Sequence, residues 1–393
     1  MKLLMKKKIV LWTGQVAGIL AVPPLYIVKN IFGITLWRMR CSRIGHLAAN
    51  TELFSRRLQL AAIPGKKHLV LALDKPCNEQ LFSMFRRNLS MFTIPLPKPL
   101  RAISKVVATN SLASTLGLFL EMPFSVNEYA EFSAQPTLSF TDAENAKGKE
   151  LLKQLGVQKW FVCLHARDAA YLNKQWKGGD SYHEFRNCSI ENYVEAAKYV
   201  VKQGGVALRM GAAVEKPLES KVRSKKIIDY AVHHRSDFGD IYLSAKCKFF
   251  LGNTAGLYDV ATIFSVPVAI ANVIPLNYPP LRSTDLFIPK KIWSERQKRF
   301  LTFREMLNSE IIDFLNPQEY TNAGLTPHEN SPEEILDLAI EMNGRLDGTW
   351  KSSPEDEALQ QKFKSLFGTQ SRCYGFPSRI GAKFLRENKD LLE

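Results

Sequence analysis

The sequence predicts an α/β protein built on parallel sheets. From residue 159 onward, short and almost uninterrupted apolar segments alternate with helical segments, which is the pattern of strands covered by helices on both faces. The chain has 393 residues, enough for two or three domains that each bury a core. With 46% hydrophobic and 23% charged residues it has the composition of a folded chain, which excludes the disordered class.

Residues 1–40 predict a membrane-associating segment. Four lysines stand in the first eight residues, and Ile9–Val28 then runs for 20 residues without a charge, a length that could cross a bilayer. Pro23 and Pro24 interrupt this segment, and basic residues stand on both sides of it, so the positive-inside rule gives no orientation. Three alternatives stay open: an interfacial anchor on the cytoplasmic face of the inner membrane, a single span, or a buried core element. A cleavable signal peptide is disfavoured, since no small-residue cleavage site is evident.

The excess positive charge is concentrated near the start of the chain. The net charge is +15, and residues 1–60 contain ten basic residues against one acid, Glu52. We therefore expect an anionic membrane surface as a partner. The remaining residues carry no basic stripe with interleaved aromatic residues, so we expect no nucleic-acid binding.

The cysteine pattern indicates reduced thiols. Six cysteines are dispersed without a C-x-x-C pair, so neither a disulfide framework nor a zinc ligand set can be assembled from them. We expect no metal and no cofactor.

Residues 41–140 predict a first domain. His68–Asp74 has the pattern of a buried strand, and Asn78–Arg87 that of the helix after it. Before these, Ser42–Asn50 predicts a glycine turn that leads into a helix over Thr51–Leu60.

Residues 141–345 predict a second domain. Thr141 and Glu144 have capping-box spacing, so a helix should begin there and run to about Leu155. Strands are expected over 159–164, 205–210, 248–251 and 266–271, and helices over 190–203, 238–247, 256–264 and 332–341. Residues 346–393 predict a helical extension.

The first candidate site lies where the strand over 159–164 ends. His165, Arg167 and Asp168 follow that strand directly. The donors of an arginine at a strand end match phosphate oxygens. Asp168 could act as a base or orient one of its neighbours.

A second candidate loop follows the strand over 248–251. Small residues there allow a ligand to approach the backbone, and the helix start could bind an anion, with Thr254 as its cap. The strand over 205–210 lies between the other two in sequence, and its end is expected at the same edge of the sheet. The candidate residues at these two strand ends are Arg209, Gly211, Asn253, Thr254, Ala255 and Gly256.

Several common catalytic signatures are missing from the sequence. It contains no G-x-G-x-x-G, Walker, H-E-x-x-H or G-x-S-x-G motif. It also lacks a D-x-D pair at a strand end, the usual holder of a divalent ion against a diphosphate. If a nucleoside diphosphate leaves in the reaction, cationic side chains and helix N–H groups must stabilise it instead.

Five segments span most of residues 42–290: SRIGHLAANTELFSRR, FVCLHARDAAYL, SYHEFRNCSIENY, RMG and FFLGNTAGLYDVATIFSVPVAIAN. They resemble a bacterial glycosyltransferase family from surface-polysaccharide clusters. His165 and Arg167 are similar to the H-x-R motif of fucosyltransferase-like GT-B enzymes, whose arginine contacts the donor diphosphate. That pattern commonly has a second arginine where this chain has Asp168.

The resemblance implies a GT-B-like fold with two Rossmann-like domains facing across a cleft. The nucleotide-sugar donor would bind the second domain, and a glycan or lipid-linked acceptor the first. The extension over 346–393 would pack back on the first domain. The acceptor-side candidates are Arg43, Gly45, His46 and Asn50.

The resulting hypothesis is a metal-independent glycosyltransferase of surface polysaccharide biosynthesis, such as that of lipopolysaccharide. A carboxylate or imidazole would deprotonate the acceptor hydroxyl. Two alternatives stay open: a sugar-nucleotide epimerase, and a non-catalytic polysaccharide assembly protein. The candidates for the base are His165, Asp168, His183 and Glu184.

Overall fold

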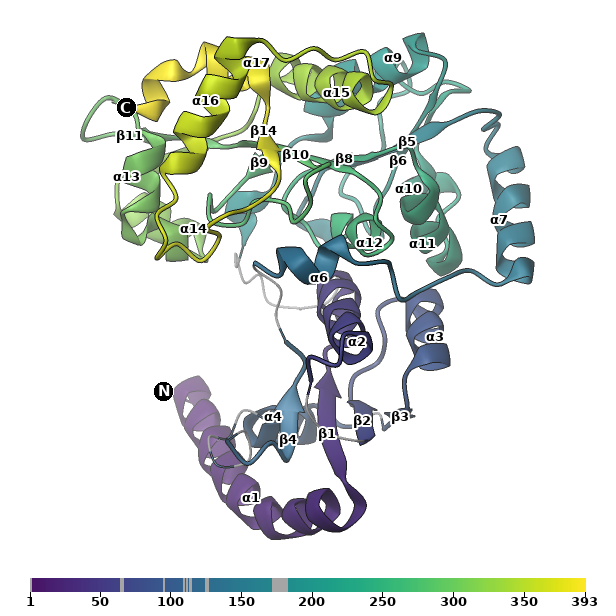
Figure 1. Cartoon of the computed structure of the whole chain (residues 1–393), viewed down its shortest axis with the longest axis vertical. Coiled ribbons are helices and arrows are strands. Elements are labelled where there is room, and N and C mark those ends of the chain that lie inside the picture. Colours follow the sequence, from purple (N-terminus) through teal and green to yellow (C-terminus); the bar gives the residue numbers. More distant parts are fainter. Residues whose placement is uncertain are drawn as a thin grey trace. The chain divides into compact units, whose positions relative to one another are not determined.

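The computed structural model describes residues 2–63, 67–94, 96–108, 110, 112, 115–123, 127–171 and 183–393, with only the backbone at residues 2–8, 10, 11 and 98. The chain divides into two compact units (Figure 1). The first comprises residues 1–125 and 134–140, and the second comprises residues 126–133 and 141–393.

The first unit contains a four-stranded parallel sheet with the strand order β3-β2-β1-β4. Its strands are β1 Ile34–Met39, β2 Lys67–Ala72, β3 Met91–Thr93 and β4 Phe119–Glu121. The predicted strand over 68–74 is confirmed as β2. The helices of this unit include α1 Lys2–Phe32, α2 Thr51–Gln59, α3 Glu79–Asn88 and α4 Lys98–Ala108.

The predicted glycine turn before α2 is wrong. Gly45 has φ −62° and ψ −44°, which is ordinary right-handed helical backbone, and a π-helical segment over His46–Asn50 runs directly into α2. Leu47, Ala48 and Asn50 are buried, so packing against the core extends the helix N-terminally where local sequence alone favours a turn.

Residues 134–140 belong to the first unit because the fully buried Glu52 holds them. One carboxylate oxygen of Glu52 accepts hydrogen bonds from Arg56 Nε, at 2.7 Å, and from the Thr137 backbone N–H, at 2.8 Å. Arg56 in turn donates to the Ala134 carbonyl at 2.9 Å. A buried ion pair is tolerated when hydrogen bonds satisfy both charges in this way.

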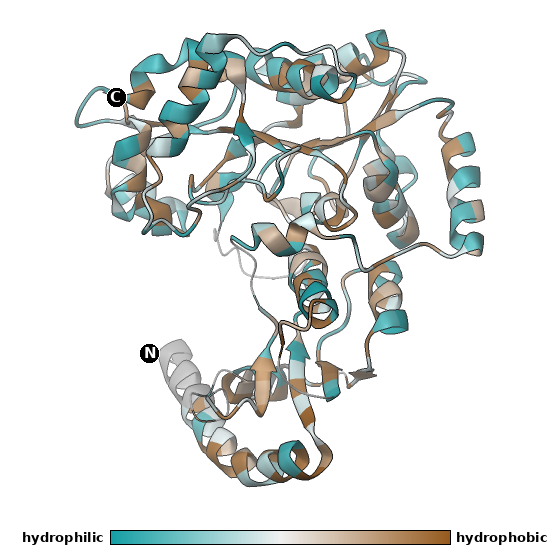
Figure 2. Cartoon of the chain, in the orientation of Figure 1, coloured by the Kyte–Doolittle hydropathy of each residue, from teal (hydrophilic) through white to brown (hydrophobic). Residues whose placement is uncertain are grey.

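The second unit contains a seven-stranded parallel sheet with the strand order β14-β10-β9-β8-β5-β6-β7. Its central strands carry buried residues almost throughout, as the near-continuous apolar segments predicted (Figure 2). The strands are β5 Phe161–His165, β6 Val206–Arg209, β7 Ile227–Ile228, β8 Phe250–Gly252, β9 Val268–Val273, β10 Leu286–Pro289 and β14 Arg379–Ile380.

Helices cover both faces of this sheet, with α9 and α15 on one side and α11 and α12 on the other (Figure 1). The capping box at Thr141 is confirmed: its hydroxyl accepts from the Glu144 N–H at 3.2 Å, and Glu144 accepts from the Thr141 N–H at 2.8 Å. The helices of this unit include α6 Tyr129–Ser133, α7 Asp142–Gln154, α9 Val194–Lys202, α10 Tyr230–His233, α11 Asp237–Lys246, α12 Tyr258–Ile263, α13 Phe303–Leu307, α14 Pro317–Asn322 and α15 Pro332–Leu346.

A small antiparallel sheet with the order β12-β11-β13 lies in the same unit. Its strands are β11 Lys291–Ser294, β12 Arg299–Phe300 and β13 Leu325–His328. The predicted helix over 332–341 is confirmed as α15, five residues longer.

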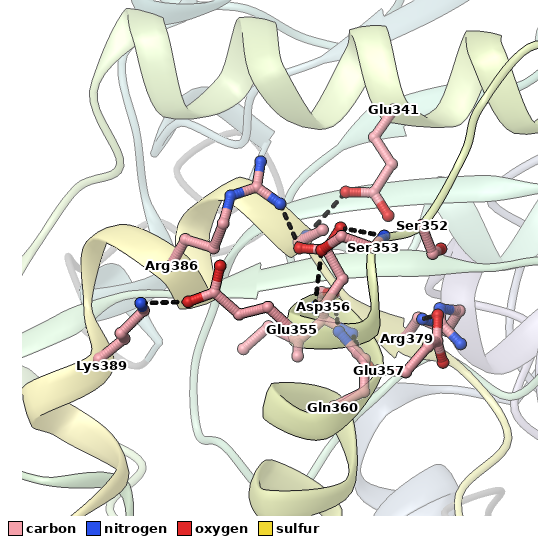
Figure 3. Close-up of polar contacts among 12 residues, drawn as sticks. Glu341, Ser352, Ser353, Glu355, Asp356, Glu357, Gln360, Arg379, Arg386 and Lys389 are labelled. Atoms are coloured by element: carbon pink, nitrogen blue, oxygen red, sulfur yellow. Dashed lines mark hydrogen bonds and ion pairs between the residues drawn. The ribbon is translucent and has the colours of Figure 1, made fainter.

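The predicted extension over 346–393 lies within the second unit. It contains α16 Pro354–Ser365 and α17 Ala382–Glu387, and its strand β14 pairs with β10. Ion pairs join its parts, with Arg386 on Asp356 and Arg379 on Glu357, and Glu341 of α15 accepts from the Ala382 N–H at 2.7 Å (Figure 3).

Both parallel sheets have the strand order of doubly wound α/β folds. In the first sheet the order reverses between β1 and β4, and in the second between β5 and β8. The predicted α/β class with parallel sheets is therefore confirmed. The structure defines each unit by itself, so the predicted cleft between two domains stays a prediction.

Candidate functional site in the second unit

The candidate site lies at the carboxyl edge of the seven-stranded sheet, where the strand order reverses. In parallel α/β sheets this position is the usual place for a ligand. Strands β5 and β8 pair there with His165 opposite Gly252. Arg167 follows β5 and Asn253 follows β8, so the two predicted loops are neighbours.

Asn253 joins the segments that carry two arginines. Its side chain is fully buried. Its Oδ1 accepts from the Arg167 backbone N–H at 2.9 Å, and its Nδ2 donates to the Arg186 carbonyl at 2.7 Å. Arg186 lies in a single 3-10 turn over Glu184–Arg186. One buried amide therefore fixes the backbone of both arginines.

The segment around Arg186 is held on two further sides. Arg167 Nη1 donates to the His183 carbonyl at 2.7 Å and to Asn187 Oδ1. The buried Lys290 donates from Nζ to the Phe185 carbonyl at 3.1 Å and to the Asn187 carbonyl at 2.8 Å. Because every acceptor here is a neutral oxygen, these contacts order the segment without neutralising its arginines.

The guanidinium groups of Arg167 and Arg186 act on each other electrostatically. Burial lowers the pKa of Arg167, and the positive charge of Arg186 lowers it further, to about 10. The Asp168 and Glu184 carboxylates act in the opposite sense. Arg167 stays protonated at neutral pH, beside a like charge that an anion between them would offset.

Within the described residues, Arg167 uses one of its three guanidinium nitrogens in hydrogen bonds. Among the described residues, Nη1 makes the two hydrogen bonds given above, while Nε and Nη2 have no protein acceptor. No carboxylate of the described ranges forms an ion pair with this side chain. Two donors thus remain for a ligand such as a phosphate.

Two of the four base candidates are constrained by their surroundings. His165 Nδ1 lies 3.2 Å from the Met210 carbonyl, which requires a proton on Nδ1 and leaves Nε2 as the acceptor. Burial lowers the pKa of His165 to about 4, so it is a weak base. Asp168 accepts backbone N–H groups from Ala170 at 3.0 Å and Glu215 at 2.9 Å, which ties two loops together.

The other two candidates border the arginine segment. His183 has φ +68°, an unusual value for a residue other than glycine, and its carbonyl faces Arg167. Its ring packs on Phe185. Glu184 is exposed, and its carboxylate forms no hydrogen bond to the described residues. It acts on Arg167 through its charge alone.

Arg209 does not present its guanidinium to a ligand. It is 2% exposed, donates to Asp229 Oδ1 at 3.1 Å and also donates to the Lys216 carbonyl at 3.2 Å. This contradicts its predicted role as a phosphate ligand. The loop that returns over β6 buries it, and Gly211, at φ +155°, begins that loop.

The predicted cap at the start of the next helix is also wrong, while anion binding by this loop stays a prediction. Thr254 does not cap α12: its hydroxyl lies 3.4 Å from the Ile274 N–H, and the residue before α12 is Leu257, without a side-chain cap. α12 itself spans only six residues. Ala255 and Gly256 lie half-exposed in the turn before it.

The acceptor-side candidates lie in the first unit, after β1. The His46 and Asn50 side chains are hydrogen-bonded, and burial together with Arg40 and Arg43 lowers the pKa of His46 to about 4. Arg43 is half-buried, and its carbonyl accepts from the Leu47 N–H at 2.9 Å. Their placement relative to Arg167 stays a prediction.

Sequence reasoning missed the residues that complete the site. Arg186 and Asn187 lie within the SYHEFRNCSIENY segment, whose first two residues are outside the described ranges. Lys290 follows β10, far away in sequence. Asp259 on α12 is a further addition: burial raises its pKa to about 8, against the opposing charge of Arg186. Only the strand-end position of Lys290 gave a signal.

Across the described ranges, no three His, Cys, Asp or Glu side chains gather closely enough to hold a metal ion.

Comparison with known proteins gives remote matches only. No protein-family model and no curated protein matches the chain. A glycosyl transferase family 9 structure from Veillonella parvula DSM 2008 is similar at 10% identity and TM-score 0.43, over 66% of this chain and 86% of that one. The ADP-heptose LPS heptosyltransferase II of E. coli is similar at 14% identity and TM-score 0.43, over 79% and 99%.

A UDP-N-acetylglucosamine 2-epimerase is similar at 12% identity and TM-score 0.36, over 82% of this chain and 97% of that one. With TM-scores of 0.43 or less, these likenesses carry no argument about the fold or the chemistry of this chain.

Proposed function

We propose that this protein is a glycosyltransferase that binds the diphosphate of a nucleotide sugar at Arg167 and Arg186. The sugar passes to a glycan or lipid-linked acceptor in bacterial surface polysaccharide biosynthesis, at the cytoplasmic face of the inner membrane. One observation carries the proposal: two arginines stand together where the strand order reverses, and within the described residues the guanidinium of Arg167 donates to neutral oxygens.

The arginines would act on the leaving group. In the transfer, a bond forms between the acceptor oxygen and the anomeric carbon while the bond from that carbon to the diphosphate oxygen breaks. The electron pair of that bond leaves with the nucleoside diphosphate. Two guanidinium groups stabilise this developing charge, which is the role that a divalent ion would otherwise fill, so we propose that the enzyme is metal-independent.

Glu184 is the base that fits best among the four candidates. Its carboxylate is exposed and close enough to Arg167 to affect its pKa. Asp168 is engaged by two backbone N–H groups, and His165 Nδ1 is engaged by the Met210 carbonyl. Glu184 would take the acceptor hydroxyl proton as the new glycosidic bond forms.

The binding test mixes the purified full chain with ADP, GDP, UDP and their sugar conjugates. Binding is measured from the shift in melting temperature and by calorimetry. At least one conjugate should stabilise the protein, and EDTA should not change its affinity. Arg167→Ala and Arg186→Ala should each weaken binding by about 10- to 100-fold, since each removes charge-assisted hydrogen bonds. The matched control is Arg296→Ala, an exposed arginine in the turn between β11 and β12.

The transfer test separates binding from chemistry. Glu184→Gln should keep donor affinity and lose transfer of labelled sugar to a glycan extract by at least about 100-fold. Isomerisation of the nucleotide sugar without an acceptor would identify the alternative epimerase. If no diphosphate binds, or if Arg167→Ala binds as well as wild type, the proposal is wrong. Mass analysis of the surface glycan in a deletion strain would then identify the transferred sugar.

A further inference from the structure

Helix α1 has two unlike apolar faces, and one of them packs on the first unit. Gly14 lies against α4 and Gly18 against Asn110, the second residue after that helix: a Cβ at Gly14 would come within 2.6 Å of Val106 Cβ, and one at Gly18 within 2.9 Å of Asn110 Nδ2. Glycine at both positions therefore allows the two segments to approach closely.

The same face covers part of the core of this unit. Ala17, Ala21 and Leu25 pack against a buried cluster made of Leu73, Val107, Ala108 and Phe119. Lys29 donates from Nζ to the Leu116 carbonyl, which fixes the C-terminal part of the helix. If α1 left this position, these apolar side chains would meet water, at a cost of about 1.5–3 kcal/mol for each large one fully exposed.

The opposite face is exposed and apolar. Except for Phe32, the exposed apolar side chains of α1 fall within one broad sector of the helix when 100° separates successive residues. Trp12 is 66% exposed, Leu20 72% and Ile31 70%. Nine of the eighteen large apolar side chains that are exposed in the described part of the chain lie on α1: Ile9, Trp12, Val16, Ile19, Leu20, Tyr26, Ile27, Ile31 and Phe32. Figure 2 shows the hydrophobic colouring along this helix.

An apolar face of this size needs a partner, and the charge of α1 identifies it. The helix contains no acid and five lysines, four of them within residues 2–8. Lysines near an anionic bilayer contribute about 1 kcal/mol each. Binding to a membrane surface strengthens with the apolar area that is buried and with the attraction of basic residues to anionic lipids, and α1 offers both.

Length and composition alone would also allow residues 12–32 to cross a bilayer. The packing of α1 argues against this, because a spanning helix would give up its contacts with α4. We propose that α1 lies flat on an anionic phospholipid membrane, inserts the face of Leu20 and Ile27, and keeps its glycine face on α4. This proposal does not rest on glycosyl transfer, since it is tested without a donor.

The experiment is flotation of the purified full chain with vesicles of phosphatidylcholine, alone or mixed with phosphatidylglycerol. The protein should float mainly with the mixed vesicles. Leu20→Glu with Ile27→Glu should lower partitioning by about tenfold or more, because two charges enter the inserted face. The matched control places the same charges in the second unit, with Val232→Glu and Leu346→Glu, which are exposed apolar positions, and should float like wild type.

A second measurement separates lying on the membrane from crossing it. In membranes of cells that make the full chain, alkaline carbonate should release a surface helix and leave a spanning one in the pellet. Retention in the pellet overturns the proposal, as does unchanged flotation of the double variant. A lipid-free dimer that the same substitutions dissociate would also overturn it, because a second copy would then cover this face.

Discussion

Each parallel sheet carries an arginine beside the reversal of its strand order, and the groups that hold the two arginines differ in charge. In the first unit, Arg38 belongs to β1 and Glu121 ends β4, the strand across the reversal of order. Arg38 Nη1 lies 2.6 Å from Glu121 Oε1, and Glu121 also pairs with Arg40. In addition, Asp74 pairs with Arg101 at 2.9 Å.

In the second unit, an amide occupies the place of the carboxylate. Asn253 follows β8, the strand across the reversal, and Asn187 accepts from the Arg167 guanidinium. Asn253 holds the backbone of Arg167 and Asn187 holds its guanidinium, and neither amide adds a negative charge. From this difference we predict that an arginine at a strand end binds an anion only when its protein partners are neutral.

The largest expected effect concerns Arg209, which, like Arg38, is paired with a carboxylate. Arg209→Met leaves the fully buried Asp229 without its cation, and breaking such a pair costs about 3–5 kcal/mol. Urea unfolding should show this loss, and Arg209→Met with Asp229→Asn should recover part of it. Well below the melting temperature, diphosphate affinity should stay close to that of wild type.

The opposite result would contradict the assignment of Arg209 as an arginine neutralised within the protein. If Arg209→Met is as stable as wild type and loses diphosphate binding, then Arg209 is a ligand and its ion pair is incidental. Arg167→Ala provides the reference, since it should weaken diphosphate binding more than it weakens the fold.

The next effect is a dependence on pH that both sheet edges share. His165 and His46 have pKa values of about 4, lowered first by burial, against an ordinary value of 6.5. The unfolded chain therefore binds protons before the folded one does. The stability from each neutral histidine is complete above pH 6.5 and falls as the pH drops towards 4, by about 2 kcal/mol at pH 5.

Unfolding free energies at pH 7.5 and pH 5 test this. His165→Gln and His46→Gln should each reduce the loss between the two values, and together they should reduce it further. If the single variants lose as much stability at pH 5 as wild type, then other groups cause the acid sensitivity.

Strand positions and the second-domain helices were predictable because their signals are local. Apolar segments such as 159–164 and the capping box at Thr141 depend on neighbouring residues alone. Arg167 was predictable in the same way, since it directly follows a strand.

The partners of the arginines were not predictable from local patterns. Arg209 ends β6 and Arg167 follows the neighbouring β5, so the two look alike in sequence. Yet Asp229, which pairs with the Arg209 guanidinium, lies 20 residues after it, and Asn253, which accepts from the Arg167 backbone N–H, lies 86 residues after that arginine. Which side chain returns to an arginine depends on long-range topology. The failed glycine turn at Gly45 has a similar cause, because burial of Leu47 and Ala48 overrides local propensity.

The smallest expected effect comes from exchanging the amide partner of one arginine for a carboxylate, and the carboxylate partner of the other for an amide. Asn187→Asp keeps the shape of the side chain but gives Arg167 a carboxylate, as Glu121 does for Arg38. Diphosphate affinity should fall by about tenfold, and the melting temperature should stay the same or rise, since the new ion pair competes with the ligand.

Glu121→Gln makes the reciprocal change in the first unit. It removes the negative charge shared by Arg38 and Arg40, so pyrophosphate should bind there weakly and saturably. Calorimetry measures this binding in a chain that also carries Arg167→Ala, so that pyrophosphate does not bind in the second unit. The matched control is Glu219→Gln, an exposed acid whose partner is the exposed Lys221. Asn187→Asp could leave diphosphate affinity unchanged while Glu121→Gln creates no pyrophosphate site. The charge of the protein partner would then not decide where an anion binds, and the position at the strand reversal must decide it alone.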